Sequence, residues 1–269
     1  MKKLSILLCA LVAMTACSTK QNNADTTSTK SLIVYYSQTH ATEQVAKTLQ
    51  NMIGADIEAI SAVMPYDGDF QQTIARCQEE MSANILPELN PMQKNIADYD
   101  TIYLGYPVWF GTFAQPMAAL IGMNDFAGKV VIPFCTFGSG GLNTTSDQLK
   151  EKLQNATILP GYGVRNARIA AAETEVRQFL INSGIIAGEK VSLPEFGESQ
   201  EITEETKKIF DAACGSYQMP LGTPVTFSSR SIENGTEYLF NVEMNGTASG
   251  RIYVTAMDGA EPEFTQVER

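Results

Sequence analysis

Residues 31–53, SLIVYYSQTHATEQVAKTLQNMI, decide the fold of this chain. The run from Leu32 to Tyr36 is almost continuously apolar, which is typical of a parallel strand buried on both faces. After a short polar turn, apolar residues recur at the spacing of a helix, and these are Val45, Ala46, Leu49, Met52 and Ile53. The stretch therefore predicts a buried strand, a turn and an amphipathic helix.

The turn from Ser37 to Thr42, the first loop, carries three side-chain hydroxyls. Amide groups at a helix start lack partners within the helix, so hydroxyls beside them make a receptor for phosphate. The turn contains no Lys or Arg, and no GxxxxGK[ST] or GxGxxG motif occurs there, which favours a phosphate monoester over a triphosphate with Mg²⁺. A plain turn capped by Ser and Thr fits the same residues, so this turn alone decides nothing.

Strand-like and helix-like segments alternate beyond this stretch. Strands are predicted at 55–60, 99–106, 129–134 and 157–164, the first of them near a sheet edge because its apolar residues alternate. Helices are predicted at 69–84, from Pro116 onward, at 146–153 and at 173–183. This alternation predicts an α/β domain over residues 31–188, with a doubly wound parallel sheet of five strands and right-handed crossovers.

Three loops follow the carboxyl ends of predicted buried strands, where ligands bind in such sheets. The second loop, Pro107 to Gly111, contains Trp109, the only tryptophan of the chain. The third loop, residues 135–141, is rich in glycine. A hydroxyl-lined turn, an aromatic plate and a loop of bare backbone together predict a receptor for a flat ring on a phosphorylated tail.

The three loops resemble those of flavodoxins, in particular the group with GYPVWFGT after the third strand and PFCT-x-G-x-G after the fourth. Ser37-x-Thr39-x-x-Thr42 matches the family's phosphate loop, T/S-x-T-G-x-T, and the resemblance covers residues 31–185. It implies FMN as a noncovalent cofactor, with Trp109 stacking on the ring. The residues implied for FMN are Ser37, Gln38, Thr39, His40, Ala41 and Thr42 at the phosphate, Pro107, Val108, Trp109, Phe110 and Gly111 beside the isoalloxazine, and Thr136, Gly138, Ser139 and Gly140 at its other side or polar edge.

One departure from the family pattern concerns the phosphate loop. The family's Gly is His40 here, the only histidine of the chain, and the usual Asn is Ala41. If this position keeps a positive φ, His40 costs about 1 kcal/mol. If the loop relaxes instead, an imidazolium beside the phosphate adds attraction. An exposed His40 without a role and a weakened flavin site are the remaining alternatives.

The N-terminus has the form of a signal peptide over residues 1–16, with Lys2 and Lys3 before an apolar run too short to span a bilayer. The sequence Met14-Thr15-Ala16-Cys17 resembles a bacterial lipoprotein signal, so Cys17 is the expected lipidation site. Residues 17–30 are then a flexible polar tether. We expect a lipid-anchored protein of the cell envelope, facing the periplasm or the exterior; an ordinary secretory signal is the alternative.

Beyond Cys9 and Cys17, three cysteines remain, Cys77, Cys135 and Cys214. Their spacing matches no metal site or CxxC motif. An oxidising compartment permits one disulfide, but we expect three small buried hydrophobic residues. No base or second cysteine accompanies Cys135, so we expect no catalytic role for it.

The composition changes after residue 188. Residues 189–202 form a linker rich in Pro, Gly and Glu, and residues 203–269 contain one predicted helix followed by strand-like runs at 225–231, 237–244, 251–257 and 263–267. This order predicts a helix packed on an antiparallel sheet, an α+β domain. It resembles the cystatin-like fold, although Ser231 and Glu233 replace the Gln and Val of the cystatin Q-x-V-x-G hairpin, so protease inhibition is not implied. Docking, gating or stabilisation are the expected roles.

The formal net charge of -11 and the lack of a Lys/Arg cluster argue against nucleic acid as a partner. With the resemblance to flavodoxins, the expected function is electron transfer through FMN. No NAD(P)H-binding domain is recognisable, so a redox partner protein or a quinone is the expected partner. Two alternatives stay open: an FMN-dependent NAD(P)H or quinone oxidoreductase, and a non-redox binding module that has lost the flavin. The oligomeric state is undetermined.

Overall fold

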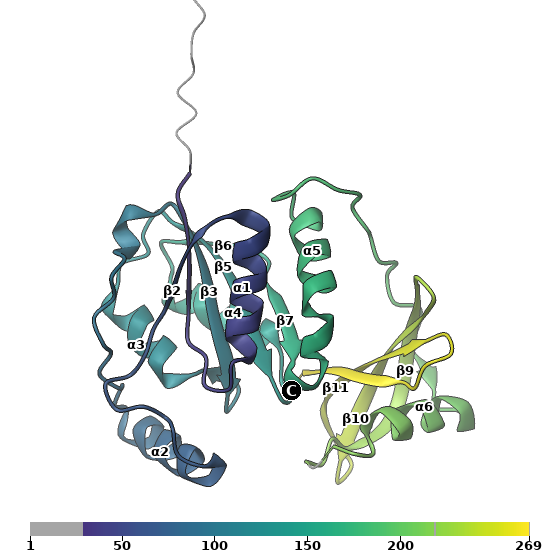
Figure 1. Cartoon of the computed structure of the whole chain (residues 1–269). Helices are drawn as coiled ribbons and strands as arrows, with labels where there is room; N and C mark the ends of the chain where they lie inside the picture. The colour runs from purple at the N-terminus through teal and green to yellow at the C-terminus, as the bar shows by residue number, and fades with distance from the viewer. Residues whose placement is uncertain (1–28, 218, 269) are drawn as a thin grey trace, which may run out of the picture.

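The computed structural model describes residues 29–217 and 219–268, which form two domains (Figure 1). The predicted signal peptide, the lipidation site Cys17 and most of the tether lie outside the described residues. The elements of the first domain are β1 (Ser31–Tyr35), α1 (Ala41–Ile53), β2 (Asp56–Ala59), α2 (Phe70–Ala83), the 3-10 helix η1 (Ile96–Asp98), β3 (Thr101–Trp109), β4 (Thr112–Phe113), α3 (Gln115–Met123), β5 (Val130–Phe137), α4 (Leu142–Lys152), β6 (Thr157–Ile158), β7 (Tyr162–Arg165), the 3-10 helix η2 (Asn166–Ala171) and α5 (Ala172–Asn182).

A parallel sheet forms the centre of this domain, with the strand order β2-β1-β3-β5-β6. The strand β7 pairs with β5 beyond β6, and the short β4 pairs antiparallel with β3. This is the doubly wound order that places ligands beyond the carboxyl ends of β1 and β3, where the chain changes direction across the sheet. The predicted α/β fold is confirmed, and β2 lies at the sheet edge as expected.

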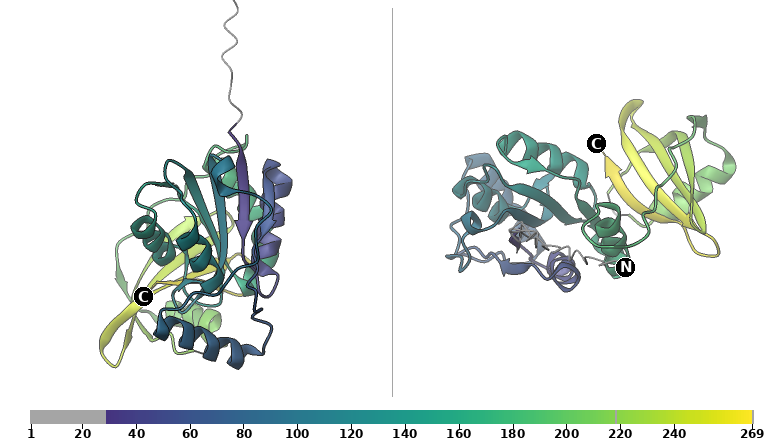
Figure 2. Two further views of the ribbon diagram at one scale, coloured as in Figure 1. Left: turned by 90° about the vertical axis from the view of Figure 1, so that its left-hand side faces the viewer. Right: turned by 90° about the horizontal axis from the view of Figure 1, so that it is seen from above.

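Helices cover both faces of the sheet (Figure 2). On one face Ile33 and Tyr35 of β1 share a core with α1 and α5, and on the other Leu32 and Val34 share a core with α3 and α4. Both sets of β1 side chains are almost inaccessible to solvent, because parallel strands in this fold are covered on each side. The unbroken apolar run that predicted a doubly buried strand is therefore explained by the two cores.

The fifth predicted strand, 157–164, is divided into β6 and β7. Pro160 and Gly161 lie between the two pieces, and a Cβ on Gly161 would stand 2.1 Å from the Pro133 carbonyl oxygen, so only glycine fits there. The helix α4 begins at Leu142, four residues before the predicted start, and Gly141 is its N-cap. The predicted helix 69–84 agrees closely with α2, which covers Phe70–Ala83. Its start is marked by Asp69, which forms a capping box with Gln72.

The second domain, called the C-terminal module here, is an antiparallel sheet with one helix, as predicted. Its strand order is β12-β11-β10-β9-β8, and Phe210 of α6 packs into the core of this sheet. The likeness to cystatins stays a prediction. The elements are β8 (Gln200–Glu201), which falls inside the predicted linker, α6 (Glu204–Cys214), β9 (Thr223–Ile232), β10 (Gly235–Met244), β11 (Thr247–Met257) and β12 (Glu263–Glu268).

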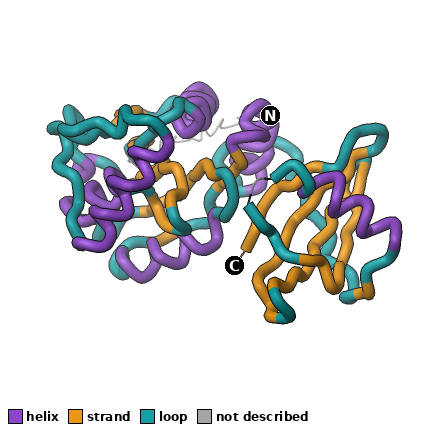
Figure 3. The backbone as a smooth tube through the Cα atoms, turned by 90° about the horizontal axis from the view of Figure 1, so that it is seen from below, coloured by secondary structure: helices purple, strands orange, loops and turns teal. Residues whose placement is uncertain are grey.

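The two sheets are separate and lie side by side (Figure 3). The chain enters the first domain at the amino end of β1, and β12, the last described strand, ends near the first domain (Figure 1). None of the helices within the described ranges combines the length and the apolar character needed to cross a membrane.

Candidate functional site

The first loop connects β1 to α1, and His40 is the N-cap of that helix. His40 adopts φ 65° and ψ -3°, the left-handed conformation that glycine takes at low cost. Of the two alternatives that the sequence left open, the structure therefore shows the positive φ at His40 rather than a relaxed loop. No side chain caps the start of α1 by a hydrogen bond, so the capped turn that the sequence left open is not formed.

A buried hydroxyl without a partner lies in this loop. Within residues 29–217 and 219–268, Ser37 Oγ is the one buried side-chain oxygen or nitrogen that has no hydrogen-bond partner. Leaving such an atom unpaired costs about 1–3 kcal/mol, so a native protein normally satisfies it. An unpaired hydroxyl and an uncapped helix start together fit a bound phosphate, which accepts hydrogen bonds from both.

Charges beside this loop balance one another. His40 Nδ1 lies 2.6 Å from Glu43 Oε2, and Lys47 pairs with the other oxygen of the same carboxylate. The hydrogen bond from Lys47, and after it the bond to His40, lowers the pKa of Glu43. The imidazole is 87% exposed, so its pairing with Glu43 leaves it at the surface. A carboxylate in the first turn of α1 would repel a phosphate, and its two basic partners reduce that repulsion.

The second loop is the end of β3 and its tight hairpin with β4. Trp109 is half-buried, with its ring centroid 5.3 Å from that of Tyr66 and 5.7 Å from that of Tyr36. Phe110 follows at the hairpin tip with φ 50° and is 50% exposed. The two aromatic side chains therefore differ: Trp109 is packed against neighbours, and Phe110 is exposed on a strained backbone.

The three loops meet. The hydroxyls of Thr42 and Thr136 hydrogen-bond at 2.9 Å, which joins the first loop to the third. Val108 Cγ1 lies 3.8 Å from where a Cβ on Gly140 would stand, which brings the second loop against the third. Thr42 and Thr136 are buried, and each hydroxyl has the other as its hydrogen-bond partner.

The first loop is also held from outside. The Gln38 side-chain amide donates to the Tyr66 carbonyl at 2.8 Å and to Thr73 Oγ1 at 3.0 Å. Tyr66 in turn donates to Glu80 and lies under the guanidinium of Arg76. Tyr66 therefore links the first loop to Trp109. The remaining residues of the predicted site, Thr39, Ala41, Pro107, Gly111 and Ser139, lie in the same three loops, and Thr39 and Gly111 are exposed.

Sequence reasoning missed Arg165, the last residue of β7. Its Nε donates to the carbonyl oxygen of Gly138 at 2.9 Å, so a cationic side chain supports the third loop. Burial lowers the pKa of Arg165. Because β7 pairs in parallel with β5, the end of β7 adjoins the third loop, and that position in a parallel sheet is the signal that could have identified it.

The thiol of Cys135 adjoins the site but is fully buried. Burial raises its pKa far above the ordinary range of a thiol. A neutral, inaccessible thiol is a poor nucleophile. The expectation of small buried residues is confirmed for all three described cysteines, which are free and buried.

Residues 30–182, more than half of the chain, match the family model for flavodoxins. A Bacteroides eggerthii protein assigned as a flavoprotein is 25% identical, with a TM-score of 0.51, and the match covers 60% of this chain and 99% of that chain. A protein from Bacteroides uniformis, also assigned as a flavoprotein, is 27% identical with a TM-score of 0.49, over 55% of this chain and 98% of that chain. A Lactobacillus acidophilus flavoprotein solved in complex with FMN is 21% identical with a TM-score of 0.46, over 54% and 99%.

No protein of curated function matches the chain. The family match ends at residue 182, before the C-terminal module. The matched residues include β1 to β7 and the three loops at the carboxyl ends of the strands. The chain belongs to the flavodoxin family.

Proposed function

We propose that this protein binds FMN noncovalently and transfers electrons through it. The observation that carries the proposal is the unpaired, buried Ser37 hydroxyl in a loop that leads into the uncapped start of α1. A buried polar atom of this kind indicates a missing acceptor or donor, and a phosphate supplies acceptors. Membership of the flavodoxin family supports FMN as the owner of that phosphate.

Each loop has its own part in the proposed site. Ser37 and Thr39, with the first amides of α1, hold the phosphate, and Trp109 and Phe110 flank the ring. Gly138 and Gly140 approach the edge of the ring with bare backbone, and Ser139 lies between them. FMN supplies the reversible redox chemistry when it is bound, and the protein sets its affinity and potential. The Thr42–Thr136 bond keeps the first and third loops at a fixed spacing.

We also propose that the protein is anchored in the cell envelope through a lipid on Cys17. The tether would join the first domain at the amino end of β1, whereas the three loops follow the carboxyl ends of the strands. This arrangement favours a redox partner protein over a quinone within the membrane, because the site faces away from the point of attachment.

The proposal is tested by titrating the flavin-free protein with FMN while the fluorescence of Trp109 is followed. Trp109 is the only tryptophan, so quenching reports on the second loop alone. We expect saturable quenching and a yellow protein, with FMN bound more tightly than riboflavin. A protein that takes up no FMN would overturn the proposal and favour a non-redox binding module.

A matched pair of variants tests the phosphate end of the site. Ser37→Ala removes the unpaired hydroxyl, and Ser31→Ala makes the same change at the other end of β1. We expect Ser37→Ala to weaken FMN by about tenfold and riboflavin not at all, since one hydrogen bond to a charged acceptor is lost. Ser31→Ala should change neither affinity. Oxidation of NADH by the loaded protein would favour an oxidoreductase over an electron carrier.

A further inference from the structure

The last strand of the C-terminal module, β12, lies against the third loop of the proposed site. The Val267 amide donates to the Gly140 carbonyl oxygen at 3.3 Å. A Cβ on Gly141 would stand 2.8 Å from Gln266 Nε2, so a side chain there would displace Gln266. The strand β12 thus contacts the backbone of the third loop directly. The same loop also approaches Val108 of the second loop.

Arg165 joins the loop to β12. While Nε donates to the Gly138 carbonyl, Nη1 donates to the Phe264 carbonyl at 2.6 Å. The guanidinium carbon also lies 4.0 Å from the centroid of the Phe264 ring. Arginine suits this place because its planar fork can donate to two acceptors at once while stacking on an aromatic face.

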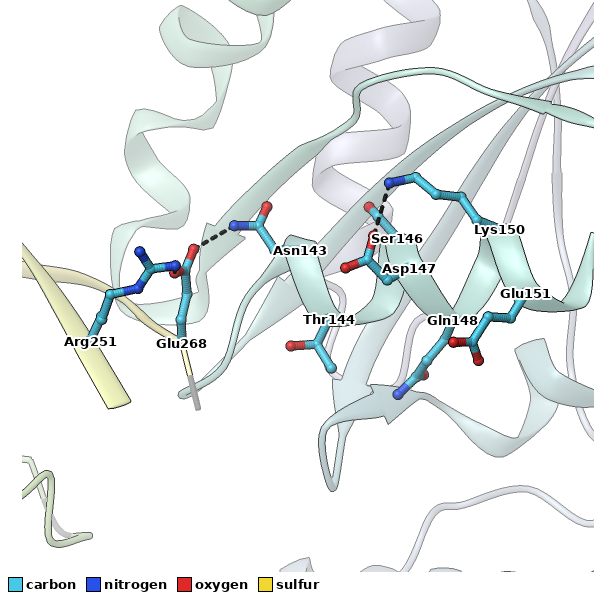
Figure 4. A pocket seen from close by; sticks show the side chains of 9 residues that line it. All are labelled: Asn143, Thr144, Ser146, Asp147, Gln148, Lys150, Glu151, Arg251 and Glu268. Carbon is cyan, nitrogen blue, oxygen red and sulfur yellow. Dashed lines mark hydrogen bonds and ion pairs between the residues drawn. The ribbon is translucent and has the colours of Figure 1, made fainter. Parts of the chain in front are cut away.

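Both ends of β12 are attached to the first domain. At its first residue, Glu263 pairs with Arg168 of η2 at 2.8 Å. At its last residue, Glu268 accepts from Asn143 of α4 and pairs with Arg251 of β11 (Figure 4). These residues adjoin an open polar cleft of about 590 Å³ between α4 and the C-terminal module. The strand is therefore fixed at its start, its middle and its end.

The third loop needs such support. Gly138, Gly140 and Gly141 make three of four successive residues glycine, and glycine loses more conformational freedom on ordering than any other residue. Gly140 has φ 109°, a conformation that other residues rarely adopt. Two hydrogen bonds from outside the loop hold its carbonyls: Arg165 donates to Gly138, and the Val267 amide of β12 donates to Gly140. Ordering a binding loop in advance raises affinity.

We propose that the C-terminal module preorganises the third loop of the flavin site, with Arg165 as the positioning residue that connects them. The inference rests on the proposed binding of FMN. The C-terminal module then has a role in the site: β12 contacts the third loop, and it acts on the ligand only by ordering that loop. The module therefore sets flavin affinity without touching the phosphate end.

The matched variants for this inference are Arg165→Ala and Arg230→Ala in the whole protein. Arg230 has the same kinds of contact as Arg165, since it pairs with Glu237, stacks on Phe196 and donates to the Pro194 carbonyl, but it lies on β9, away from β12. We expect Arg165→Ala to weaken FMN and riboflavin by the same factor, about tenfold, because it removes one hydrogen bond to the loop and the one that ties Arg165 to β12. Arg230→Ala should leave both affinities unchanged, and Arg165→Lys should be intermediate.

The pattern across ligands separates the outcomes. Equal affinities for wild type and Arg165→Ala would overturn the inference and leave the proposed function standing. Weakening of FMN without weakening of riboflavin would place Arg165 at the phosphate and also overturn it. A wild type that binds neither flavin would overturn the proposed function.

A measurement without flavin tests the same inference. Hydrogen exchange of the amides in residues 138–141 should be faster in Arg165→Ala than in wild type or Arg230→Ala, and unchanged exchange would contradict preorganisation. If Arg165→Ala does not fold, Glu263→Lys replaces it, because that side chain is 60% exposed and its reversal sets two cations face to face. Glu263→Lys should also speed hydrogen exchange in residues 138–141. Unchanged exchange in that variant would again overturn the inference.

Discussion

The hydroxyls of Thr42 and Thr136 hydrogen-bond at 2.9 Å inside the protein, although the two residues are 94 positions apart in the chain. Thr42 lies in the first turn of α1 and Thr136 near the end of β5, so the bond joins two of the three loops of the proposed flavin site. Both residues are about 1% exposed, which means that neither hydroxyl can turn to water instead.

We predict that Thr42→Val and Thr136→Val each lower the free energy of unfolding by about 1–3 kcal/mol, because each leaves one buried hydroxyl unpaired. The double variant should be less destabilised than the sum of the two, since no unpaired group then remains. Urea unfolding of the four proteins measures the coupling. Strictly additive losses would contradict the structural importance of this bond.

The left-handed conformation of His40 leads to a second prediction. Replacing His40 by Gly should raise the free energy of unfolding of the flavin-free protein by about 1 kcal/mol, since the strain of a non-glycine residue is removed. The lost pairing with Glu43 offsets little of this, because the imidazole is exposed. Thermal unfolding measures the effect.

The control for His40 is the reciprocal change at the other end of the same helix. Gly54, the C-cap of α1, has φ 66° with open space around it. Gly54→Ala should therefore lower the free energy of unfolding by about 1 kcal/mol, because it places a non-glycine residue at a positive φ. A less stable His40→Gly protein would show that the His40–Glu43–Lys47 arrangement outweighs the backbone strain.

The strand, turn and helix of residues 31–53 could be predicted because their signal is local. The apolar run of β1, the polar turn and the helical periodicity of α1 all lie within a few residues of one another. The three loops could be placed together because parallel strands end at one edge of a sheet.

The contact of β12 with the third loop could not be predicted in this way. Arg165 and Phe264 are 99 positions apart, and their hydrogen bond depends on how two domains dock. Neither the arginine at the end of β7 nor the alternating pattern of β12 indicates in the sequence that the two are in contact. The unpaired state of Ser37 likewise appears only once the surrounding packing is known.

The strained hairpin tip leads to a third prediction. Phe110 combines φ 50° with half-exposure, a costly arrangement for an aromatic residue that contributes little to the core. Such strain often persists where function requires it. We predict that Phe110→Gly raises the free energy of unfolding by about 1 kcal/mol and at the same time weakens FMN binding.

The control is Phe70→Ala on α2, an aromatic residue that is 75% exposed and lies outside the three loops. It should leave FMN affinity unchanged. Trp109→Ala, by contrast, should lose both stability, by about 3 kcal/mol, and affinity, because its ring packs against Tyr36 and Tyr66. If Phe110→Gly binds FMN as wild type does, the exposed ring has no part in the site.

The buried thiols lead to the last prediction, which concerns pH. Burial raises the pKa of Cys77 from its ordinary value of 9.0 to about 11 and that of Cys214 to about 12. Below pH 9 these thiols are neutral in both the folded and the unfolded chain, so their contribution to stability is fully present. Between pH 9 and 11 the unfolded chain releases thiol protons that the folded chain retains, so the free energy of unfolding falls as the pH rises.

Urea unfolding at a series of alkaline pH values should therefore show a decline that Cys77→Ala makes shallower, by up to about 1.4 kcal/mol for each pH unit between the two pKa values. In the soluble protein without residues 1–17, native thiols should be unreactive to a thiol reagent at pH 8 and should react rapidly in urea. Neutral thiols in a closed core explain both results. Rapid labelling of Cys135 in the native protein would contradict the burial of that thiol and would reopen a redox role beside the flavin.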